Sequence, residues 1–294
     1  MATTKPHLLY GVWFCYQAKP ASIVLMVYIE IAFFLGLLGA AMGSFADAMA
    51  WRMHTKRNMV NDRSECESCH HKLGVLDLIP IFSWLWLRGK CRYCGAKISP
   101  LIPVTEVLLA AAFASSYLYW PLGFDAWQGI ALYALWLCYL VALAILLVYD
   151  ARWMLLPDKI VFPLVVLGFI DAALRVSLIP GAGITEYILY VGLGVSALAG
   201  LYGLLYAVSR GQWVGFGDVK LSIFIGAVLG WQKAFLVLGL ANVIGFFVVM
   251  PGLLTGKLSR TSRVPFGPFL IAGFLVAGLF GDQLIHWYLG FIGL

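Results

Sequence analysis

Long apolar stretches, separated by short polar loops, are the feature that most constrains this chain. Residues 127–149 and 234–254, for example, contain no Asp, Glu, Lys or Arg. About 20 apolar residues are enough for a helix to cross the hydrocarbon core of a bilayer. Of the 294 residues, 62% are hydrophobic and 12% are charged, whereas a soluble domain has about 25% charged residues. The sequence therefore excludes a soluble enzyme, a disordered chain and a disulfide-rich secreted module.

These stretches predict an all-α polytopic membrane protein with about eight transmembrane helices and a small cytoplasmic zinc-ribbon-like domain. We expect three parts: residues 1–50 (an amino-terminal segment and the first transmembrane helix), 51–103 (the zinc-binding domain) and 104–294 (a seven-helix membrane domain). The expected spans lie near residues 22–46, 104–122, 126–149, 160–180, 184–208, 219–232, 234–254 and 267–291.

The distribution of positive charge predicts the orientation. The block at residues 51–100 holds nine of the 20 Lys and Arg residues. If this block is cytoplasmic, 16 of the 20 fall on the cytoplasmic side and four, including Lys5 and Lys19, fall outside. Cytoplasmic loops of membrane proteins carry such an excess of Lys and Arg, so we expect both termini outside. The formal net charge of +6 then reflects topology and contact with the lipid bilayer, with no nucleic-acid partner.

Two cysteine pairs in the polar block predict a metal site. Cys66 and Cys69 form one CxxC turn, and Cys91 and Cys94 form a second one 21 residues further on. Paired CxxC turns bring four thiolates to one tetrahedral Zn²⁺, and four cysteine ligands leave no open position for catalysis. The expected zinc is therefore structural. His70 and His71 are alternative ligands, and four unliganded cysteines in a loop are the remaining alternative.

Two aspartates are expected at the same membrane depth. Asp150 closes the third predicted span, and Asp218 opens the sixth. Two neighbouring carboxylates can share a proton and a water, one acting as general base while the other acts as acid. On the residues alone, two interfacial aspartates that end helices explain the pattern better than a catalytic dyad. Glu30 and Asp171 lie inside spans, which leaves a membrane transporter or assembly scaffold that uses intramembrane carboxylates as an alternative function.

Six short motifs follow one another along the chain. They are Gly43-Ser44-Phe45, the two cysteine pairs, Ile79-Pro80-Ile81-Phe82-Ser83-Trp84 with Leu87-Arg88-Gly89-Lys90, Asp150 with Leu156-Pro157-Asp158, Gly215-Phe216-Gly217-Asp218 with Val219-Lys220, and Val264-Pro265-Phe266-Gly267-Pro268-Phe269. In this order and at these spacings, the motifs resemble those of the type IV prepilin peptidases, the GxGD-type membrane aspartyl proteases of bacteria. The resemblance covers nearly the whole chain after residue 35.

The resemblance implies an activity. Members of this family cut the basic leader from the prepilins of type IV pili and the pseudopilins of type II secretion systems, at the cytoplasmic face of the bacterial inner membrane. Many members also methylate the new amino terminus with S-adenosylmethionine. The resemblance makes Asp150 and Asp218 the catalytic aspartates and prepilins or pseudopilins the substrates.

Other residues are expected to support the site. Asp158 is the rival of Asp150 and is placed in a loop beyond a proline. Lys220 either stabilises the negative charge of Asp218 or contacts the substrate, or it only anchors its helix at the membrane interface. Glu106 either binds the substrate amino terminus or caps a helix. The flanking glycines let a peptide approach closely, and the last motif shapes the substrate groove; these residues are Gly215, Gly217, Pro265, Phe266, Gly267 and Pro268.

The amino-terminal third departs from the family pattern. Asp47 stands where the family usually has asparagine, and Glu67 stands where a proline usually follows the first cysteine. The segment from Ser99 to Glu106 lacks the usual Arg-Tyr-Pro run. Because this third is often linked to methylation, the resemblance supports proteolysis more firmly than methyl transfer.

Overall fold

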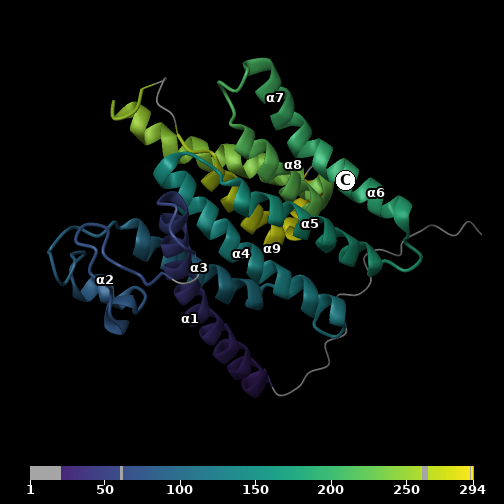
Figure 1. The fold of residues 1–294 in the computed structure, drawn as a ribbon. Coiled ribbons are helices and arrows are strands. Elements are labelled where there is room, and N and C mark those ends of the chain that lie inside the picture. Colours follow the sequence, from purple (N-terminus) through teal and green to yellow (C-terminus); the bar gives the residue numbers. More distant parts are fainter. Residues whose placement is uncertain (1–20, 60–61, 260–263, 292, 294) are drawn as a thin grey trace, which may run out of the picture.

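The computed structural model describes residues 21–59, 62–259, 264–291 and 293 (Figure 1). Lys5, Lys19, Arg260 and Arg263, which entered the charge count, lie outside the described residues. Within the described part, seven helical stretches are long and apolar enough to cross a membrane. The elements are α1 (Ala21–His54), η1 (Val75–Leu78), α2 (Phe82–Trp86), α3 (Leu101–Leu118), α4 (Trp127–Trp153), α5 (Asp158–Ser177), α6 (Ile184–Val195), η2 (Ser196–Gly200), α7 (Leu201–Ser209), α8 (Phe216–Leu254) and α9 (Gly267–Phe291).

A break in α8 accounts for the difference between seven helical stretches and eight expected spans. The helix has 39 residues, which at 1.5 Å per residue would be about 58 Å long, nearly twice the hydrocarbon core of a bilayer. Gly230 lies inside it with a non-helical backbone, at φ 71° and ψ 175°. The two segments that meet at Gly230 are the sixth and seventh predicted spans.

Helices α1 and α3 pack closely through glycines. A Cβ atom on Gly39 would lie 2.5 Å from the Leu109 carbonyl oxygen, and one on Gly43 would lie 2.6 Å from the Glu106 Cα. Small residues four apart allow two helix backbones to touch in this way. The glycine of the Gly43-Ser44-Phe45 motif is thus required for contact between α1 and α3. The cysteine-containing segment lies beside these two helices, at the edge of the bundle (Figure 1).

An aromatic core joins α4, α8 and α9. The ring of Phe224 lies 5.0 Å from that of Tyr139 and 5.3 Å from that of Phe274, and Phe274 stacks on Trp136 at 5.2 Å. All four side chains are almost completely buried. Aromatic pairs at such distances add about 0.5–1.5 kcal/mol each beyond the burial of their area. This core fixes the three helices whose ends carry Asp150, Asp218 and Gly267.

Three helix boundaries differ from those expected. α1 continues to His54 and α4 continues to Trp153, so polar residues at the membrane boundary extend both helices. Asp158 does not lie in a loop, because it is the first residue of α5, with Pro157 as its amino-terminal cap. Proline is pre-organised for the first turn of a helix and ends the preceding loop there.

The two intramembrane carboxylates occupy different environments. Asp171 is fully buried and forms an ion pair with Arg175, one turn along α5. Glu30 lies on the exposed face of α1, which does not pack against α5 in the bundle of Figure 1. Asp171 therefore has a local partner, and its ion pair explains its place in the span.

Candidate active site and metal centre

Asp150 is held near the carboxyl-terminal end of α4 by the first residue of α9. Its carboxyl group is only 5% exposed, and Oδ2 accepts a hydrogen bond of 3.1 Å from the Gly267 N–H. A Cβ atom on residue 267 would lie 2.6 Å from that oxygen. Glycine is therefore the residue that allows the α9 backbone to reach the carboxylate, which gives the Pro-Phe-Gly-Pro-Phe motif a direct role at Asp150.

Asp218 lies in the first turn of α8. Its N–H donates to the carbonyl of Gly215, the cap residue, at 3.1 Å, and its carboxylate lies beside that residue, since a Cβ on Gly215 would be 3.4 Å from Asp218 Oδ2. The amino terminus of a helix favours negative charge. Asp218 and Asp150 lie within electrostatic range of each other. The structure thus brings together the two aspartates that the sequence singled out.

Leu156 fills the space between the two motifs that carry glycine. A Cβ atom on Gly217 would lie 3.0 Å from the Leu156 Cβ, and one on Gly267 would lie 3.5 Å from its Cδ2. The side chain of Leu156 therefore packs against both backbones. This contact explains why a leucine precedes Pro157 in the short loop between α4 and α5.

Asp158 and Lys220 form an ion pair at the edge of the site. The Lys220 Nζ also lies over two aromatic rings, 5.5 Å from the centroid of Phe162 and 5.2 Å from that of Phe216. Asp158 is 57% exposed, whereas the Lys220 side chain is 12% exposed. The pair joins the start of α5 to the start of α8. The ion-pair partner of Lys220 is therefore Asp158.

The last motif also contributes aromatic and proline residues. Phe266 packs against Tyr202 at 5.8 Å and against Phe269 at 5.9 Å between ring centroids. Pro265 lies half-buried just before α9, and Pro268 is in its first turn. Proline is tolerated there because the first N–H groups of a helix have no partner within the helix. These residues close one side of the site around Asp150.

The four predicted metal ligands converge. The Sγ atoms of Cys66, Cys69, Cys91 and Cys94 all lie within 4.8 Å of one another, and those of Cys66 and Cys94 are 3.9 Å apart. Four sulfurs at 2.3 Å from a tetrahedral Zn²⁺ would be about 3.8 Å apart. The donor set and its spacing therefore fit a closed, structural zinc site.

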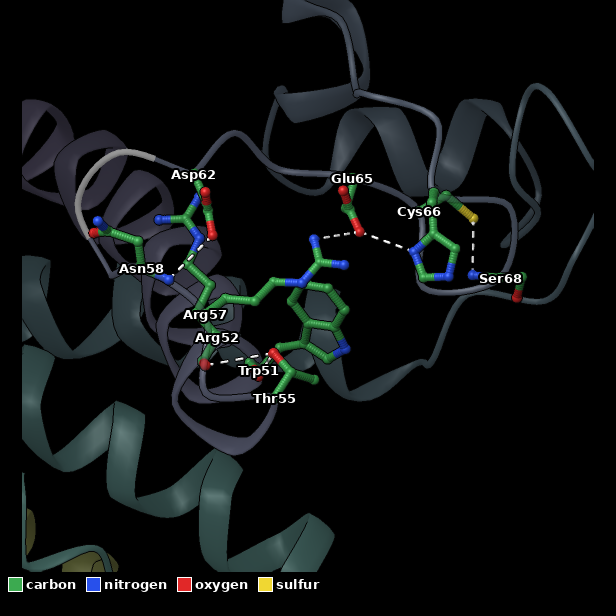
Figure 2. Close-up of polar contacts among 10 residues, drawn as sticks. Trp51, Arg52, Thr55, Arg57, Asn58, Asp62, Glu65, Cys66 and Ser68 are labelled. Atoms are coloured by element: carbon green, nitrogen blue, oxygen red, sulfur yellow. Dashed lines mark hydrogen bonds and ion pairs between the residues drawn. The ribbon is translucent and has the colours of Figure 1, made fainter.

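The two cysteine turns have the same backbone geometry. The Cys66 N–H donates to the His71 carbonyl at 3.0 Å, and the Cys91 N–H donates to the Ala96 carbonyl at 2.8 Å. His70 (φ 57°) and Gly95 (φ 71°) occupy the matching left-handed position. Figure 2 shows the Ser68 N–H pointing to the Cys66 Sγ at 3.4 Å, as backbone amides do in such turns.

The two histidines have other contacts. His70 Nδ1 lies 2.9 Å from Glu65 Oε1, and the His71 ring packs on Tyr93 at 3.6 Å between centroids. Arg57, just beyond α1, forms an ion pair of 2.6 Å with the same Glu65 (Figure 2). Hydrogen bonding to His70, and then the charge of Arg57, hold the pKa of Glu65 below its ordinary value. These contacts attach the first cysteine turn to the end of α1.

Glu106 connects α1, α3 and the loop before α2. Glu106 is 3% exposed; its carboxylate lies near Ser44 and accepts a hydrogen bond of 2.6 Å from the Ile81 N–H. Because α3 begins at Leu101, Glu106 is in the helix interior and the expectation of a helix cap is wrong.

Ile81 is the residue that Glu106 holds. It has φ 64° and ψ −53°, and the Phe82 N–H donates to the Pro80 carbonyl at 2.6 Å. This is a γ-turn of the rarer, strained kind, and a β-branched residue is uncommon at positive φ. The buried carboxylate of Glu106 therefore stabilises a strained turn in the Ile-Pro motif.

A cavity of about 200 Å³ lies between the cysteine domain and the ends of α1 and α3. Asp47, Glu106 and Arg152 line it. Arg152 lies 3.2 Å from Asp47 Oδ1 and 3.2 Å from Glu67 Oε1. Two of the three departures from the family pattern, Asp47 and Glu67, are therefore partners of one arginine.

One carboxylate oxygen of Asp47 is free to accept a hydrogen bond. Its side chain is 5% exposed, and Oδ2 has no hydrogen-bond partner among the described residues. Thr105 lies beside it, but the Thr105 hydroxyl donates to the Leu101 carbonyl. The cavity thus contains a buried acceptor that is available to a ligand.

Comparisons with known proteins identify the family of the chain. Residues 37–120 match the bacterial peptidase A24 N-terminal domain, and residues 136–250 match the type IV leader peptidase family. A prepilin leader peptidase/N-methyltransferase of Bacillus subtilis is 30% identical over 261 residues, which cover 89% of this chain and 98% of the relative. The corresponding protein of Aeromonas hydrophila is 34% identical over 237 residues, 79% of this chain and 76% of the relative.

The chain belongs to the type IV leader peptidase family. A protein of the same description from Stutzerimonas stutzeri is 34% identical over 234 residues, 80% of this chain and 77% of the relative. No solved structure matches the chain. The family assignment confirms the resemblance on which the expected activity rests, and nothing supports the transporter or scaffold alternative.

Sequence reasoning missed three residues near the family motifs: Arg152, Leu156 and Tyr202. The position of Arg152, two residues after Asp150, could have drawn attention to it. Its residue type could not, because a basic residue is common at a membrane boundary. Leu156 is part of a quoted motif but carries no chemistry of its own. Tyr202 lies in an apolar helix with no sequence signal, and only the structure places it beside Asp218.

Proposed function

We propose that this peptidase cleaves the leader of type IV prepilins or pseudopilins at the cytoplasmic face of the bacterial inner membrane. The observation that carries the proposal is the pair of Asp150 and Asp218. Two carboxylates from separate helices lie near each other; that of Asp150 accepts the Gly267 N–H, and that of Asp218 lies beside Gly215 at the start of α8. The alternative of two aspartates that merely end helices does not explain why α9 reaches Asp150.

The dyad supplies acid and base. Two close carboxylates repel each other when both are ionised, so one proton is retained between them. The ionised member takes a proton from water as the water attacks the scissile carbonyl carbon, and the protonated member gives its proton to the leaving amine. General acid–base assistance of this kind contributes about 10²–10⁴-fold to the rate.

The test uses purified protein in nanodiscs and a prepilin with an intact leader. Asp150→Asn and Asp218→Asn each keep the side-chain volume and should abolish cleavage. Asp158→Asn is the matched control, because it removes a carboxylate from an exposed ion pair at the same boundary and should retain cleavage. Full cleavage by either of the first two variants would refute the dyad, and an inactive Asp158→Asn would mean that Asp158 is the first carboxylate.

We also propose that the chain methylates the new amino terminus and that the cavity beside Glu106 serves this reaction. S-adenosylmethionine supplies the methyl group when bound. Its sulfonium and the substrate ammonium are cationic, and the cavity contains the buried carboxylates of Asp47 and Glu106. A methylated product is heavier than the unmethylated one by one methyl group, about 14 Da. Glu106→Gln should lower the fraction of product that carries this added mass and leave leader removal unchanged. Equal loss of both activities would contradict this division.

The cysteine domain is proposed to hold one structural Zn²⁺. With four cysteine ligands no position is open for water, so the metal stabilises the domain and takes no part in hydrolysis. The division into residues 1–50, 51–103 and 104–294, and the orientation with this domain in the cytoplasm, remain predictions. Cysteine accessibility to an impermeant reagent in cells would test the orientation.

A further inference from the structure

Tyr202 lies just after an irregular turn of helix. The five residues of η2 form a π-helical segment, and α7 begins at Leu201 immediately after it. A π-helical turn inserts an extra residue into an α-helix, and such turns are frequent at functional sites. The inserted residue rotates the side chains that follow, including Tyr202, relative to those of α6.

The surroundings of Tyr202 belong to the proteolytic site. Gly203, the next residue, faces Val219: a Cβ there would lie 3.8 Å from the Val219 Cγ1. The start of α7 therefore packs beside the first turn of α8, which carries Asp218. Tyr202 interacts electrostatically with Asp218, and its ring packs on Phe266, next to the residue that donates to Asp150.

The hydroxyl of Tyr202 has no partner. The residue is 3% exposed, yet its oxygen makes no hydrogen bond to any described residue. Elsewhere in the bundle the hydroxyl of Tyr139 donates to the Leu167 carbonyl at 3.0 Å, and that of Tyr190 donates to the Val228 carbonyl at 2.8 Å. Burying a hydroxyl without a partner is unfavourable, so the donor at Tyr202 calls for an acceptor that arrives with a ligand.

We propose that the Tyr202 hydroxyl donates a hydrogen bond to the scissile carbonyl oxygen of the bound substrate. As water adds to the carbonyl carbon, negative charge develops on that oxygen, and a fixed donor stabilises it. The hydroxyl keeps its proton throughout. The proton of the water goes to one aspartate, the leaving amine takes a proton from the other, and the C–N bond breaks.

This role rests on the proposed peptidase function and adds a fixed hydrogen-bond donor for the carbonyl oxygen to the acid and base that the two carboxylates supply. In the proposed dyad one aspartate is ionised and acts as the base, and the other is protonated and acts as the acid. The ionised aspartate has no proton to donate to the oxygen, and the protonated aspartate gives its proton to the leaving amine. A neutral phenol beside Asp218 adds the missing donor without a further charge.

The experiment compares Tyr202→Phe with Tyr139→Phe in the full chain, in nanodiscs, with an intact prepilin as substrate. Removing one donor to a developing oxyanion lowers kcat by about 10²–10³-fold. For Tyr202→Phe we expect this loss in kcat, a KM within about twofold, an unchanged shape of the pH–rate profile and a melting temperature that is equal or higher. Tyr139→Phe should show the reverse: a normal kcat and a lower melting temperature, because its hydroxyl already has a partner.

Each outcome of this experiment either supports or overturns the proposed role of Tyr202. A kcat within threefold of wild type for Tyr202→Phe overturns the proposal. So does a melting temperature that falls as far as that of Tyr139→Phe, or a failure to fold, because either would mean that the hydroxyl is structurally required. A displaced pH–rate profile also overturns it, since the residue would then act by moving Asp218. If wild type and Tyr139→Phe both fail to cleave prepilin, the proposed function is wrong, independently of Tyr202.

Discussion

Replacing Arg152 with methionine removes the cation that joins α4, α1 and the cysteine domain. Methionine keeps most of the length and apolar volume of the side chain, so the loss is mainly that of charge. Arg152 pairs with Asp47 and Glu67, both at 3.2 Å, and its own side chain is 15% exposed. The substitution leaves the buried Asp47 carboxylate without its ion-pair partner.

The size of the effect follows from burial. Breaking a buried ion pair by removing one partner costs about 3–5 kcal/mol, and an exposed pair is worth about 0–1 kcal/mol. Asp47 is 5% exposed, whereas Glu67 is 57% exposed. We therefore expect Arg152→Met to destabilise the fold by about 2–3 kcal/mol, just below the buried range because Arg152 is partly exposed, and Glu67→Gln by less than about 1 kcal/mol.

Thermal unfolding followed by tryptophan fluorescence measures this difference, since the chain has 11 tryptophans. For a domain of 150–250 residues, about 1 kcal/mol shifts the melting temperature by roughly 2–4 °C, so Arg152→Met should lower it by roughly 4–12 °C. The control is Asp47→Asn/Arg152→Met, which replaces both charges and should recover at least half of the loss.

Two results would refute this reasoning. If Arg152→Met and Glu67→Gln shift the melting temperature equally, the burial of Asp47 does not determine how much stability is lost. If the double variant is no more stable than Arg152→Met, the penalty does not come from an unpaired carboxylate at position 47.

Three further outcomes are expected. Gly267→Ala places a Cβ 2.6 Å from Asp150 Oδ2 and should lower leader cleavage at least tenfold, whereas Gly290→Ala on the same helix meets nothing within 4 Å and should be fully active. Gly230→Ala forces alanine to φ 71° and places its Cβ 2.8 Å from the Tyr190 ring. It should cost about 1–3 kcal/mol, while Gly239→Ala, with nothing within 4 Å, should leave the melting temperature unchanged or raised. Cys91→Ser should reduce zinc, measured by elemental analysis, to below half an equivalent per chain, and a full equivalent would exclude this cysteine as a ligand.

The sequence predicts the elements whose signal is local. Apolar length locates the spans, and paired CxxC spacing brings the four Sγ atoms together as expected. Asp150 and Asp218 are found because Asp150 closes one apolar run and Asp218 follows Gly217 at the start of another. Their approach to each other depends on the order of the spans across the membrane, which charge counting supplied.

What the sequence does not predict are contacts between distant segments. Glu106 holds Ile81, 25 positions before it, and no periodicity connects the two. Arg152 bonds Asp47 across 105 positions, so the charge at position 47 is intelligible only once α1 and α4 are packed together. The break at Gly230 was anticipated as a boundary between spans, but its backbone conformation could not be, because glycine in an apolar run is equally common within helices.

The end of α4 lies between the aspartate pair and the cavity beside Glu106, which are therefore one helix diameter apart. Successive residues of an α-helix are rotated by about 100°, so Asp150 and Arg152 point about 200° apart, toward nearly opposite sides of α4. One side faces Asp218, and the other faces the cavity at Asp47 and Glu106. If the two proposed sites act in turn, a new amino terminus released beside Asp150 has to travel around a cylinder about 10 Å wide to meet the cavity. That distance is a few residues of extended chain, short enough for the same substrate to reach the second site while its apolar segment stays in the membrane.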